Sequence, residues 1–475
     1  MNQLKTTGRG IESLASATHR RGKTHPSVTN PGMLLLLALT LAPGAFPAAR
    51  AGTFVCPLPD YAPLSSVTVG DTQSLPASDA CTMQAGTALT IAAPNGSLGN
   101  LGTLTVGPGS TLTNNANLDN TPGATLSNSG SFLNSTSGVV QNSGATINAG
   151  GGTLNNDGTI INLGSLENLS NGTLINLGTV TNVTAGTFSN LGSTQNLHSI
   201  DNFGQISNLP GASLLNSGTL TNNIGSSFVN FGNLDNVQTI TNSGSFRNEA
   251  GATLSNQVSF SNTGRLDIAT ASEVSGSGGF VQTAGATTVE SNALLSQEAI
   301  QINGGTLSGA GKVASLSTIS LGPDALLAPG ESGTGLNTMT VSATSGLSLA
   351  GTLNINIYSP TSYSHLDVLG MSGFSSTTRI NFFLSGDAAQ YAGESFQFLR
   401  ATGLRNFDLA TINVSGLPAT LGYSIVAENG SSLVLNLFDA PPTGAPEPGS
   451  LSLLTCGMML LGGGAWRRRR QRRNG

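Results

Sequence analysis

Asparagine returns at steps of six or eight residues through the centre of the chain, and this recurrence is the strongest constraint on its fold. Between Asn128 and Asn262 thirteen steps are six residues long and seven are eight. The step pattern from Asn168 to Asn208 is repeated from Asn208 to Asn248, which defines a 40-residue block. Self-similarity of this kind is typical of a solenoid. The ordered part of the predicted ladder comprises Asn168, Asn176, Asn182, Asn190, Asn196, Asn202, Asn208, Asn216, Asn222, Asn230, Asn236, Asn242 and Asn248.

The six-residue unit reads Asn-x-Gly-x-Φ-x, where Φ is apolar, as in the unit that begins at Asn176. It is too short for a helix and rich in residues that disfavour one. We predict one short strand per unit, with the apolar residue pointing inward and with Gly and Asn adopting a left-handed backbone at the corner. Three units, about 20 residues, would form one turn of a three-sided parallel β-helix.

The repeated runs of three six-residue steps argue against a flattened, two-sided coil. A right-handed coil is expected, because left-handed hexapeptide coils tolerate eight-residue units less readily. Stacked turns would align the asparagines into ladders whose side-chain amides bond each other. The predicted fold class is therefore all-β, a parallel β-helix or β-solenoid.

Weaker copies of the repeat extend the predicted solenoid over residues 86–335. Residues 52–85 are expected to form an N-terminal cap that protects the exposed sheet edge. Alternating strand patterns over residues 336–438 predict a C-terminal β cap or small sandwich. Residues 439–448 contain several prolines and are expected to form a stiff linker.

Three features follow one another near the end of the predicted solenoid. Ala328-Pro-Gly precedes the alternating run that begins at Leu347, and the strand Ser364-His-Leu-Asp-Val-Leu-Gly comes next. This order resembles the last part of autotransporter passenger domains, where a Pro-Gly turn, a β pair and an Asp-Val-x-Gly strand succeed one another. The resemblance implies a β-solenoid. The export route must differ, since autotransporters end in a membrane barrel and this chain has a different C-terminus.

The N-terminal residues 1–51 have the organisation of a secretory signal peptide. A basic region is followed by the short apolar run Met33–Ala42 and by the small-residue triplet Ala49-Arg50-Ala51. This order predicts cleavage after Ala51. The apolar run is too short to span a bilayer, which needs about 20 residues. Arg20-Arg21 could alternatively be read as a twin-arginine signal, but the apolar residues expected just after such a pair are missing.

The C-terminus contains a proline-glutamate-proline triplet, an uncharged stretch over residues 449–466 and an arginine-rich end over residues 467–475. The stretch is long enough for one transmembrane helix. The arginines would stop transfer and stay cytoplasmic, so the rest of the chain would lie outside. The triplet is Pro446, Glu447 and Pro448, and the membrane-stop arginines are Arg467, Arg468, Arg469, Arg470, Arg472 and Arg473.

This three-part tail resembles the PEP-CTERM sorting signal of Gram-negative bacteria. In that family exosortase, a dedicated membrane protease, recognises and processes the tail, and the proteins are associated with exopolysaccharide. The resemblance implies anchoring in the inner membrane during transit, followed by delivery to the cell surface or extracellular matrix. A plain C-terminal anchor is the alternative.

The three cysteines are consistent with export. Cys56 and Cys81 lie just after the predicted cleavage site, and Cys456 lies in the predicted membrane helix. In an oxidising compartment we expect a Cys56–Cys81 disulfide. Closing this loop would contribute roughly 3 kcal/mol in the chain-entropy model.

Charge excludes a nucleic-acid partner. Residues 52–446 hold six Lys and Arg against 21 Asp and Glu, a formal net charge of −15. A nucleic-acid-binding surface must be basic. Charged residues make up only 9% of the whole chain, well below the roughly 25% of an ordinary globular protein.

Few side chains are suited to catalysis. Parallel β-helices include polysaccharide lyases and hydrolases, which need either clustered carboxylates with a basic partner or an Arg or Lys base beside bound calcium. Arg247 and Arg265, with Asp267 nearby, are one candidate group, but solvated edge charges are the expected role. His365 and Asp367 share one strand face and are expected to form a surface pair. His198 replaces a corner glycine and is expected to be exposed.

Five aspartates fall in or beside asparagine-rich turns, but they are scattered, and calcium prefers several carboxylates on one ion. We therefore predict no catalytic residue, metal or cofactor. The expected function is an exported structural or adhesive protein of the cell surface or matrix. A β-helix polysaccharide lyase or hydrolase and an inert surface spacer are the alternatives. The aspartates are Asp119, Asp157, Asp201, Asp235 and Asp267.

Overall fold

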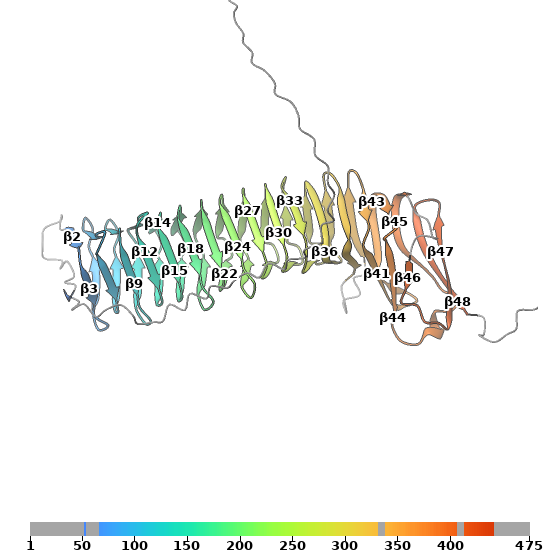
Figure 1. The fold of residues 1–475 in the computed structure, drawn as a ribbon, viewed down its shortest axis with the longest axis horizontal. Helices are drawn as coiled ribbons and strands as arrows, with labels where there is room; N and C mark the ends of the chain where they lie inside the picture. Colours follow the sequence, from blue (N-terminus) through green and yellow to red (C-terminus); the bar gives the residue numbers. More distant parts are fainter. Residues whose placement is uncertain (1–51, 54–65, 331–337, 406–412, 441–475) are drawn as a thin grey trace, which may run out of the picture. The chain divides into compact units, whose positions relative to one another are not determined.

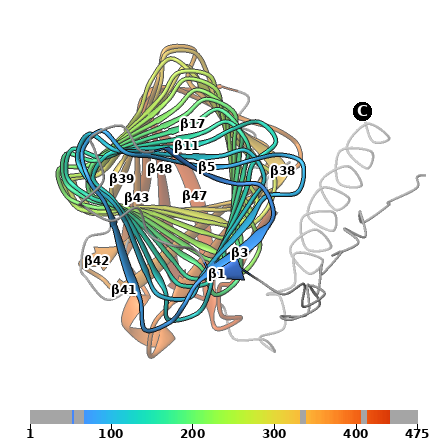
Figure 2. The same cartoon turned by 90° about the vertical axis from the view of Figure 1, so that its left-hand side faces the viewer.

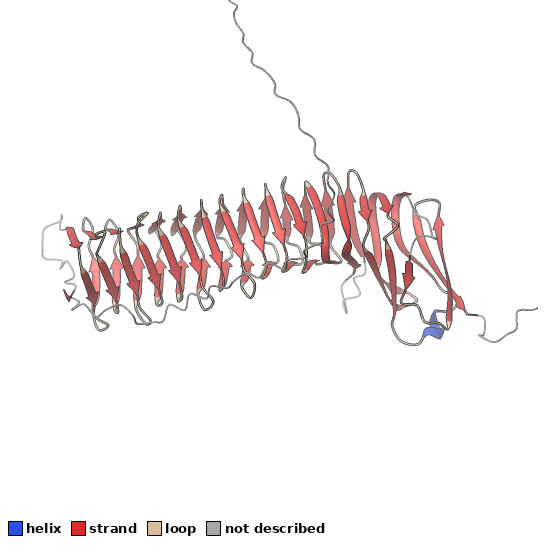
Figure 3. Ribbon diagram, viewed as in Figure 1, coloured by secondary structure: helices blue, strands red, loops and turns tan. Residues whose placement is uncertain are grey.

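A computed structural model describes residues 52–53, 66–330, 338–405 and 413–440. In this part of the chain nearly all regular structure is β-strand, and the one helix is the short 3-10 turn η1 at Ala388–Tyr391 (Figure 3). The strands form a parallel β-solenoid of about 13 turns with about 20 residues per turn (Figure 1). The predicted all-β solenoid is confirmed.

Each strand of the repeat pairs in parallel with the strand three places later, so one turn contains three strands. A view along the solenoid shows the turns superimposed (Figure 2). We name the three sides A, B and C after the strands that stack on them.

Side A contains β3 (Thr72–Leu75), β6 (Ser97–Asn100), β9 (Asn117–Asn120), β12 (Val139–Asn142), β15 (Thr159–Asn162), β18 (Thr179–Asn182), β21 (Ser199–Asn202), β24 (Thr219–Asn222), β27 (Thr239–Asn242), β30 (Ser259–Asn262) and β33 (Gly279–Gln282). Side B contains β2 (Ser66–Val69), β5 (Ala88–Ile91), β8 (Thr111–Asn114), β11 (Ser131–Asn134), β14 (Thr153–Asn156), β17 (Thr173–Asn176), β20 (Ser193–Asn196), β23 (Ser213–Asn216), β26 (Asn233–Asn236), β29 (Thr253–Asn256), β32 (Glu273–Ser275), β35 (Leu294–Gln297) and β37 (Lys312–Ser315). Side C contains β4 (Ala80–Met83), β7 (Thr103–Val106), β10 (Thr125–Asn128), β13 (Ala145–Asn148), β16 (Ser165–Asn168), β19 (Thr187–Asn190), β22 (Gln205–Asn208), β25 (Ser227–Asn230), β28 (Ser245–Asn248), β31 (Arg265–Ile268) and β34 (Ala286–Val289).

The remaining strands are β1 (Gly52–Thr53), β36 (Ala299–Gly309), β38 (Ile319–Pro329), β39 (Thr338–Ala343), β40 (Leu347–Leu349), β41 (Thr352–Ser359), β42 (Ser362–Tyr363), β43 (His365–Phe374), β44 (Arg379–Leu384), β45 (Ser395–Arg405), β46 (Asn413–Ser415), β47 (Leu421–Glu428) and β48 (Ser432–Asp439).

A typical strand of the repeat has four residues, and its side chains alternate between solvent and interior. In β17, Leu174 and Asn176 are fully buried, whereas Thr173 and Ile175 are partly exposed. This is the two-residue period expected of an extended chain. A typical strand of the repeat therefore places one apolar residue and one asparagine inside the coil.

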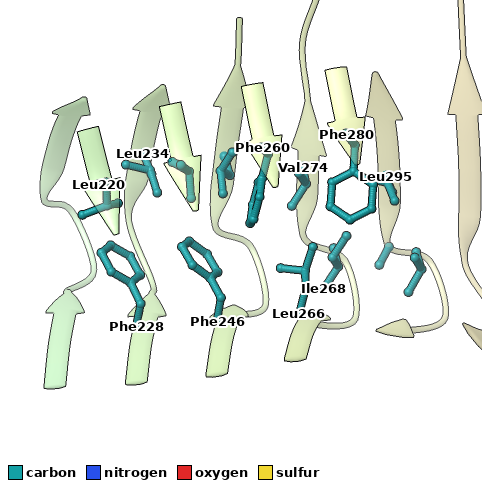
Figure 4. Packing of buried hydrophobic residues seen from close by; sticks show 14 of the residues in the cluster. Leu220, Phe228, Leu234, Phe246, Phe260, Leu266, Ile268, Val274, Phe280 and Leu295 are labelled. Atoms are coloured by element: carbon teal, nitrogen blue, oxygen red, sulfur yellow. The ribbon is translucent and has the colours of Figure 1, made fainter. Parts of the chain in front are cut away.

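The apolar residues form continuous stacks along the interior (Figure 4). Phe228 and Phe246 lie on successive turns of side C, with ring centroids 4.6 Å apart and an interplanar angle of 8°. Phe246 then meets Phe260 of side A edge-on at 5.5 Å, and Phe260 meets Phe280 at 5.6 Å. These contacts join neighbouring turns and link two sides of the coil.

The buried asparagines form three hydrogen-bonded ladders, one beside each side of the coil. Asn176 shows the pattern: its Nδ2 donates to Oδ1 of Asn196 at 2.8 Å and to the backbone oxygen of Ser199 at 2.7 Å. Its own Oδ1 accepts from Nδ2 of Asn156 at 2.7 Å. Both amide hydrogens and the oxygen are thus used, as complete burial requires. Partners in the ladders lie 18, 20 or 22 residues apart, which is one turn.

The corners differ from the sequence-based expectation. The ladder asparagines are the last residues of strands and face inward, and none of them has a positive φ. The glycine of a six-residue unit is needed for another reason: a Cβ on Gly178 would lie within 3.0 Å of the Gly158 backbone one turn away. A left-handed backbone occurs instead in loops of eight-residue units, as at Gly225, where φ is 81°.

The solenoid begins before residue 86. The strands β2, β3 and β4 of residues 66–83 already pair in parallel with β5, β6 and β7, within the segment expected to be a cap. Apolar residues such as Leu75 and Met83 take the inward position that asparagine occupies later, which hides the repeat from a search for asparagine.

Parallel stacking also continues past residue 335. The longer strands β39, β41, β43 and β44 pair in parallel with strands of the preceding or following turn. The pairing becomes antiparallel where β48 joins β45 and β47.

Several sequence-based predictions fall outside the described residues. These are the signal peptide over residues 1–51, the disulfide partner Cys56, the sorting triplet at 446–448, the helix over 449–466 and the tail over 467–475. Within the described ranges no helix has both the length and the apolar character needed to span a membrane. Cys81 is fully buried on β4 and is disulfide-bonded.

The ladder predicts that an internal asparagine contributes more stability than a terminal one. Asn196→Ala removes the side-chain acceptor of Asn176 and the side-chain donor to Asn216. We expect a loss of about 2–5 kcal/mol, since each unpaired buried polar group costs about 1–3 kcal/mol. Asn248→Ala is the matched control, because Asn248 is followed on side C by Ile268 and accepts only from Asn230. Thermal unfolding followed by circular dichroism measures both, and equal losses would contradict the ladder's role.

Close packing at the corners gives a second prediction. Gly178→Ala should lower the melting temperature, because its Cβ would collide with the neighbouring turn. Gly279→Ala is the control, since nothing lies within 4 Å of its Cβ position and its φ is unexceptional. We expect no loss of stability in the control variant. If Gly178→Ala and Gly279→Ala had the same melting temperature, the close approach at Gly178 would not require glycine.

Candidate functional site

The largest group of interacting charges in the described residues lies on side C, where two arginines and three carboxylates meet. Arg247 and Asp267 are register partners on β28 and β31, so the two arginines do not stack directly. Arg265 lies opposite Ser245, and Glu290 follows β34 on the next turn. The ionic cluster, as we name it, comprises Arg247, Glu249, Arg265, Asp267 and Glu290.

Hydrogen bonds and one longer ion pair, from Arg247 Nη1 to Asp267 Oδ2 at 4.0 Å, connect the ionic cluster across three turns. Arg247 donates from Nε to Oε1 of Glu249 at 2.9 Å and from Nη1 to Oε1 of Glu290 at 3.2 Å. Arg265 donates from Nε to Oδ2 of Asp267 at 2.6 Å. The Asp267 side chain is only 7% exposed, and its Oδ1 has no hydrogen-bond partner in the described structure.

Ionisation within the ionic cluster reflects these contacts. Burial raises the pKa of Glu290, but hydrogen bonds from Thr270 and the Arg247 guanidinium outweigh it and hold the pKa below its ordinary value. Burial lowers the pKa of Arg247, and the hydrogen bond and charge of Glu249 more than compensate. The pKa of Arg265 is raised by its hydrogen bond and charge contact with Asp267.

The ionic cluster neutralises most of its own charge. Arg247 contacts Glu249 and Glu290, and Arg265 contacts Asp267, so both positive charges are compensated within the ionic cluster. Arg265 is 67% exposed and Arg247 is 35% exposed, whereas the Asp267 side chain between them is nearly buried. The ionic cluster links β28, β31 and the end of β34 through these charge contacts.

His365 and Asp367 form a direct pair. His365 Nε2 lies 2.8 Å from Oδ1 of Asp367, and Nδ1 lies 2.7 Å from the backbone oxygen of Gln397. Both ring nitrogens therefore contact acceptors of the protein itself. A general base needs a nitrogen that reaches the substrate, whereas both ring nitrogens of His365 are engaged with groups of the protein. His198 is exposed at its corner, as predicted.

The five aspartates considered for calcium lie apart. Asp119 and Asp201 are on side A, Asp235 on side B and Asp267 on side C, while Asp157 lies at a corner. Burial raises the pKa of Asp119. In the part of the chain that the structure describes, no three His, Cys, Asp or Glu residues are grouped to hold a metal ion.

Solvent exposure determines which side chains of the solenoid can contact a ligand. The ladder asparagines are fully buried, so their side-chain amides cannot contact a ligand at the surface. The outward first and third residues of each strand make the surface, and many are Ser or Thr. A depression of about 450 Å³ is lined by Pro108, Ser110, Ser129, Gly150 and their neighbours, without an ionisable side chain.

Apolar residues are exposed where asparagine is followed by a corner. Leu177 and Leu197 occupy equivalent corners of adjacent turns and are 52% and 43% exposed. Contiguous apolar surface of this kind suits contact with another macromolecule. Other corner residues of this type are Leu163, Leu191, Phe203, Phe231 and Val237.

No protein-family model matches this chain, and no curated protein shows significant sequence similarity to it.

The ionic cluster predicts a defined pH dependence. Because the pKa of Glu290 lies below its ordinary value of 4.5, the contribution of this carboxylate to stability is present above pH 4.5 and is lost as pH falls through the folded-state pKa. Glu290→Gln should therefore melt below wild type at neutral pH, and the difference should shrink below pH 4.5. Glu298→Gln, on the loop after β35, is the control. If the difference in melting temperature between wild type and Glu290→Gln did not change with pH, the Glu290 carboxylate would make no ionic contribution to stability.

Proposed function

We propose that this chain is an exported, non-enzymatic protein of the cell surface or extracellular matrix, with a structural or adhesive role. The observation that most supports this proposal is the location of the polar and charged side chains. The solenoid buries its asparagine amides within the ladders, and the largest group of interacting charges among the described residues is engaged with itself. The solvent-exposed surface of the solenoid carries few charges and consists largely of Ser and Thr hydroxyls and of apolar side chains at the corners.

The export route is part of the proposal and depends on the sequence. The signal peptide over residues 1–51 would direct translocation, and the helix over residues 449–466 would hold the chain in the inner membrane. An exosortase-type protease would then act at the triplet 446–448. We further propose a right-handed coil and a C-terminal β cap, which would protect the last sheet edge near the membrane.

Exopolysaccharide is the proposed partner. The outward Ser and Thr hydroxyls of the strands supply hydrogen-bond donors and acceptors, and exposed corners such as Leu177 supply apolar contacts. Many weak contacts repeated along a solenoid would add up through multivalency. The alternative is an enzyme, a polysaccharide lyase or hydrolase. That function would require a reactive group other than the histidines and arginines described above. An inert spacer is the third candidate.

Processing can be tested in the producing organism by mass spectrometry of the mature chain. We expect an N-terminus at Gly52 and a C-terminus near residue 448. Glu447→Ala should leave the arginine tail attached and keep the protein in the membrane fraction. Glu428→Ala, which lies on β47 outside the triplet, should be processed normally. An intact tail on the wild-type chain would refute sorting by this motif.

Adhesion is tested separately with the purified full-length chain and the producer's own polysaccharide. Co-sedimentation without release of reducing or unsaturated ends supports the proposed role. Release of such ends would support the enzyme alternative. Failure to bind polysaccharide or cells, with unchanged cohesion after gene deletion, would leave only the spacer.

A further inference from the structure

Side A presents two rows of hydroxyl-bearing side chains over five consecutive turns. The strands β18, β21, β24, β27 and β30 pair in register, so first residues lie beside first residues and third beside third. We name these ten positions the hydroxyl array. They are Thr179, Ser199, Thr219, Thr239 and Ser259 in one row and Thr181, Asp201, Thr221, Thr241 and Ser261 in the other.

The hydroxyls of this array are available to an external ligand. All ten side chains are exposed or partly exposed. Among the described residues, the only internal side-chain hydrogen bond of the array joins Ser199 Oγ to Oδ2 of Asp201 at 3.4 Å. The hydroxyls of residues such as Thr221 and Thr241 therefore have donor and acceptor capacity that solvent must satisfy.

The other two sides show that the repeat does not by itself require hydroxyls here. At the third strand position, side B carries Gln195, Leu215 and Asp235 over the same turns. Side C carries Val229 and Arg247. The first strand position is mostly Ser or Thr on all three sides, so it is the row at the third position that distinguishes side A.

The support beneath the hydroxyl array is rigid. The amides of Asn182, Asn202, Asn222 and Asn242 are linked in one ladder by hydrogen bonds of 2.8 Å, which continues to Asn262. Threonine is β-branched and has few χ1 rotamers, so its hydroxyl and methyl are held with little loss of entropy on binding. The array is therefore preorganised.

The spacing of the hydroxyl array indicates the ligand. Neighbouring strands lie about 4.8 Å apart, and first and third residues of a strand are separated by roughly 6.8 Å. The array thus repeats in two dimensions over about 20 Å along the solenoid. A surface of crystalline water is also a two-dimensional lattice of oxygen atoms with repeats of this size. Each hydroxyl contact with water is weak, so binding needs many contacts in register on a rigid surface.

We propose that the hydroxyl array of side A binds ice. Its composition favours ice over a polysaccharide chain, since the ten positions include no aromatic side chain to stack on a sugar ring. Charged side chains keep their own hydration shell and would oppose contact with ice. Among the ten positions only Asp201 is charged. This activity goes beyond the proposed adhesive function and does not require it.

Ice-affinity partition and ice recrystallisation inhibition test the proposal with the purified full-length chain. Wild type should enter slowly growing ice and suppress recrystallisation. T221Y/T241Y places two bulky rings on adjacent turns of the array and should reduce both signals to the level of serum albumin. T221V/T241V keeps the side-chain shape and should weaken both signals, while circular dichroism confirms that the sheet is intact.

The matched control is S189Y/S207Y, which places the same rings at the third position of adjacent strands on side C. It should retain wild-type activity. Exclusion of the wild-type chain from ice overturns the proposal, as does an equal loss in both tyrosine variants. Retention on an insoluble neutral glucan that T221Y/T241Y loses, without ice partition, would assign the array to glycans and would also overturn it.

Discussion

The structure depends on hydrogen bonds between asparagine side chains that lie one turn apart inside the coil. A buried primary amide has two donors and one strong acceptor, and each must find a partner. In the ladders the next asparagine supplies the acceptor, the preceding one supplies the donor, and a backbone carbonyl takes the second hydrogen. Every asparagine therefore depends on the register of both neighbouring turns. A slip of one residue would turn the amides outward and leave apolar side chains in solvent, so the ladder selects one register.

The ends of the ladders show how the chain limits this dependence. On side A the ladder passes from Asn262 to Gln282, which keeps the amide. On side B the position after Asn256 is Gly276, and Gln297 of the next turn reaches back to Asn256 at 2.7 Å. On side C, Ile268 follows Asn248, whose amide hydrogens bond backbone oxygens instead. Apolar residues then occupy the interior, since a ladder without a partner would bury unsatisfied groups.

Interior and exterior are consequently under different constraints. The second and fourth residues of each strand must pack or hydrogen-bond, whereas the first and third residues face water and are free to differ between sides. The ionic cluster on side C, the hydroxyl array on side A and the apolar corners use that freedom. The function proposed for the chain, and the further one inferred for side A, both belong to outward residues supported by a common core.

The solenoid, its three strands per turn and the pairing of asparagine amides could be predicted from the amino-acid sequence, because these features follow from the local period. The sequence also located Arg247, Arg265 and Asp267 near one another and placed His198 at an exposed corner. The folded coil was needed to show that the asparagines are completely enclosed and that the glycines of the six-residue units permit close approach between turns. It also placed Glu290, distant in sequence, against Arg247, and it brought the threonines of side A into two rows. These features arise from residues about 20 or 40 positions apart, and contacts at that range depend on the exact length of each turn.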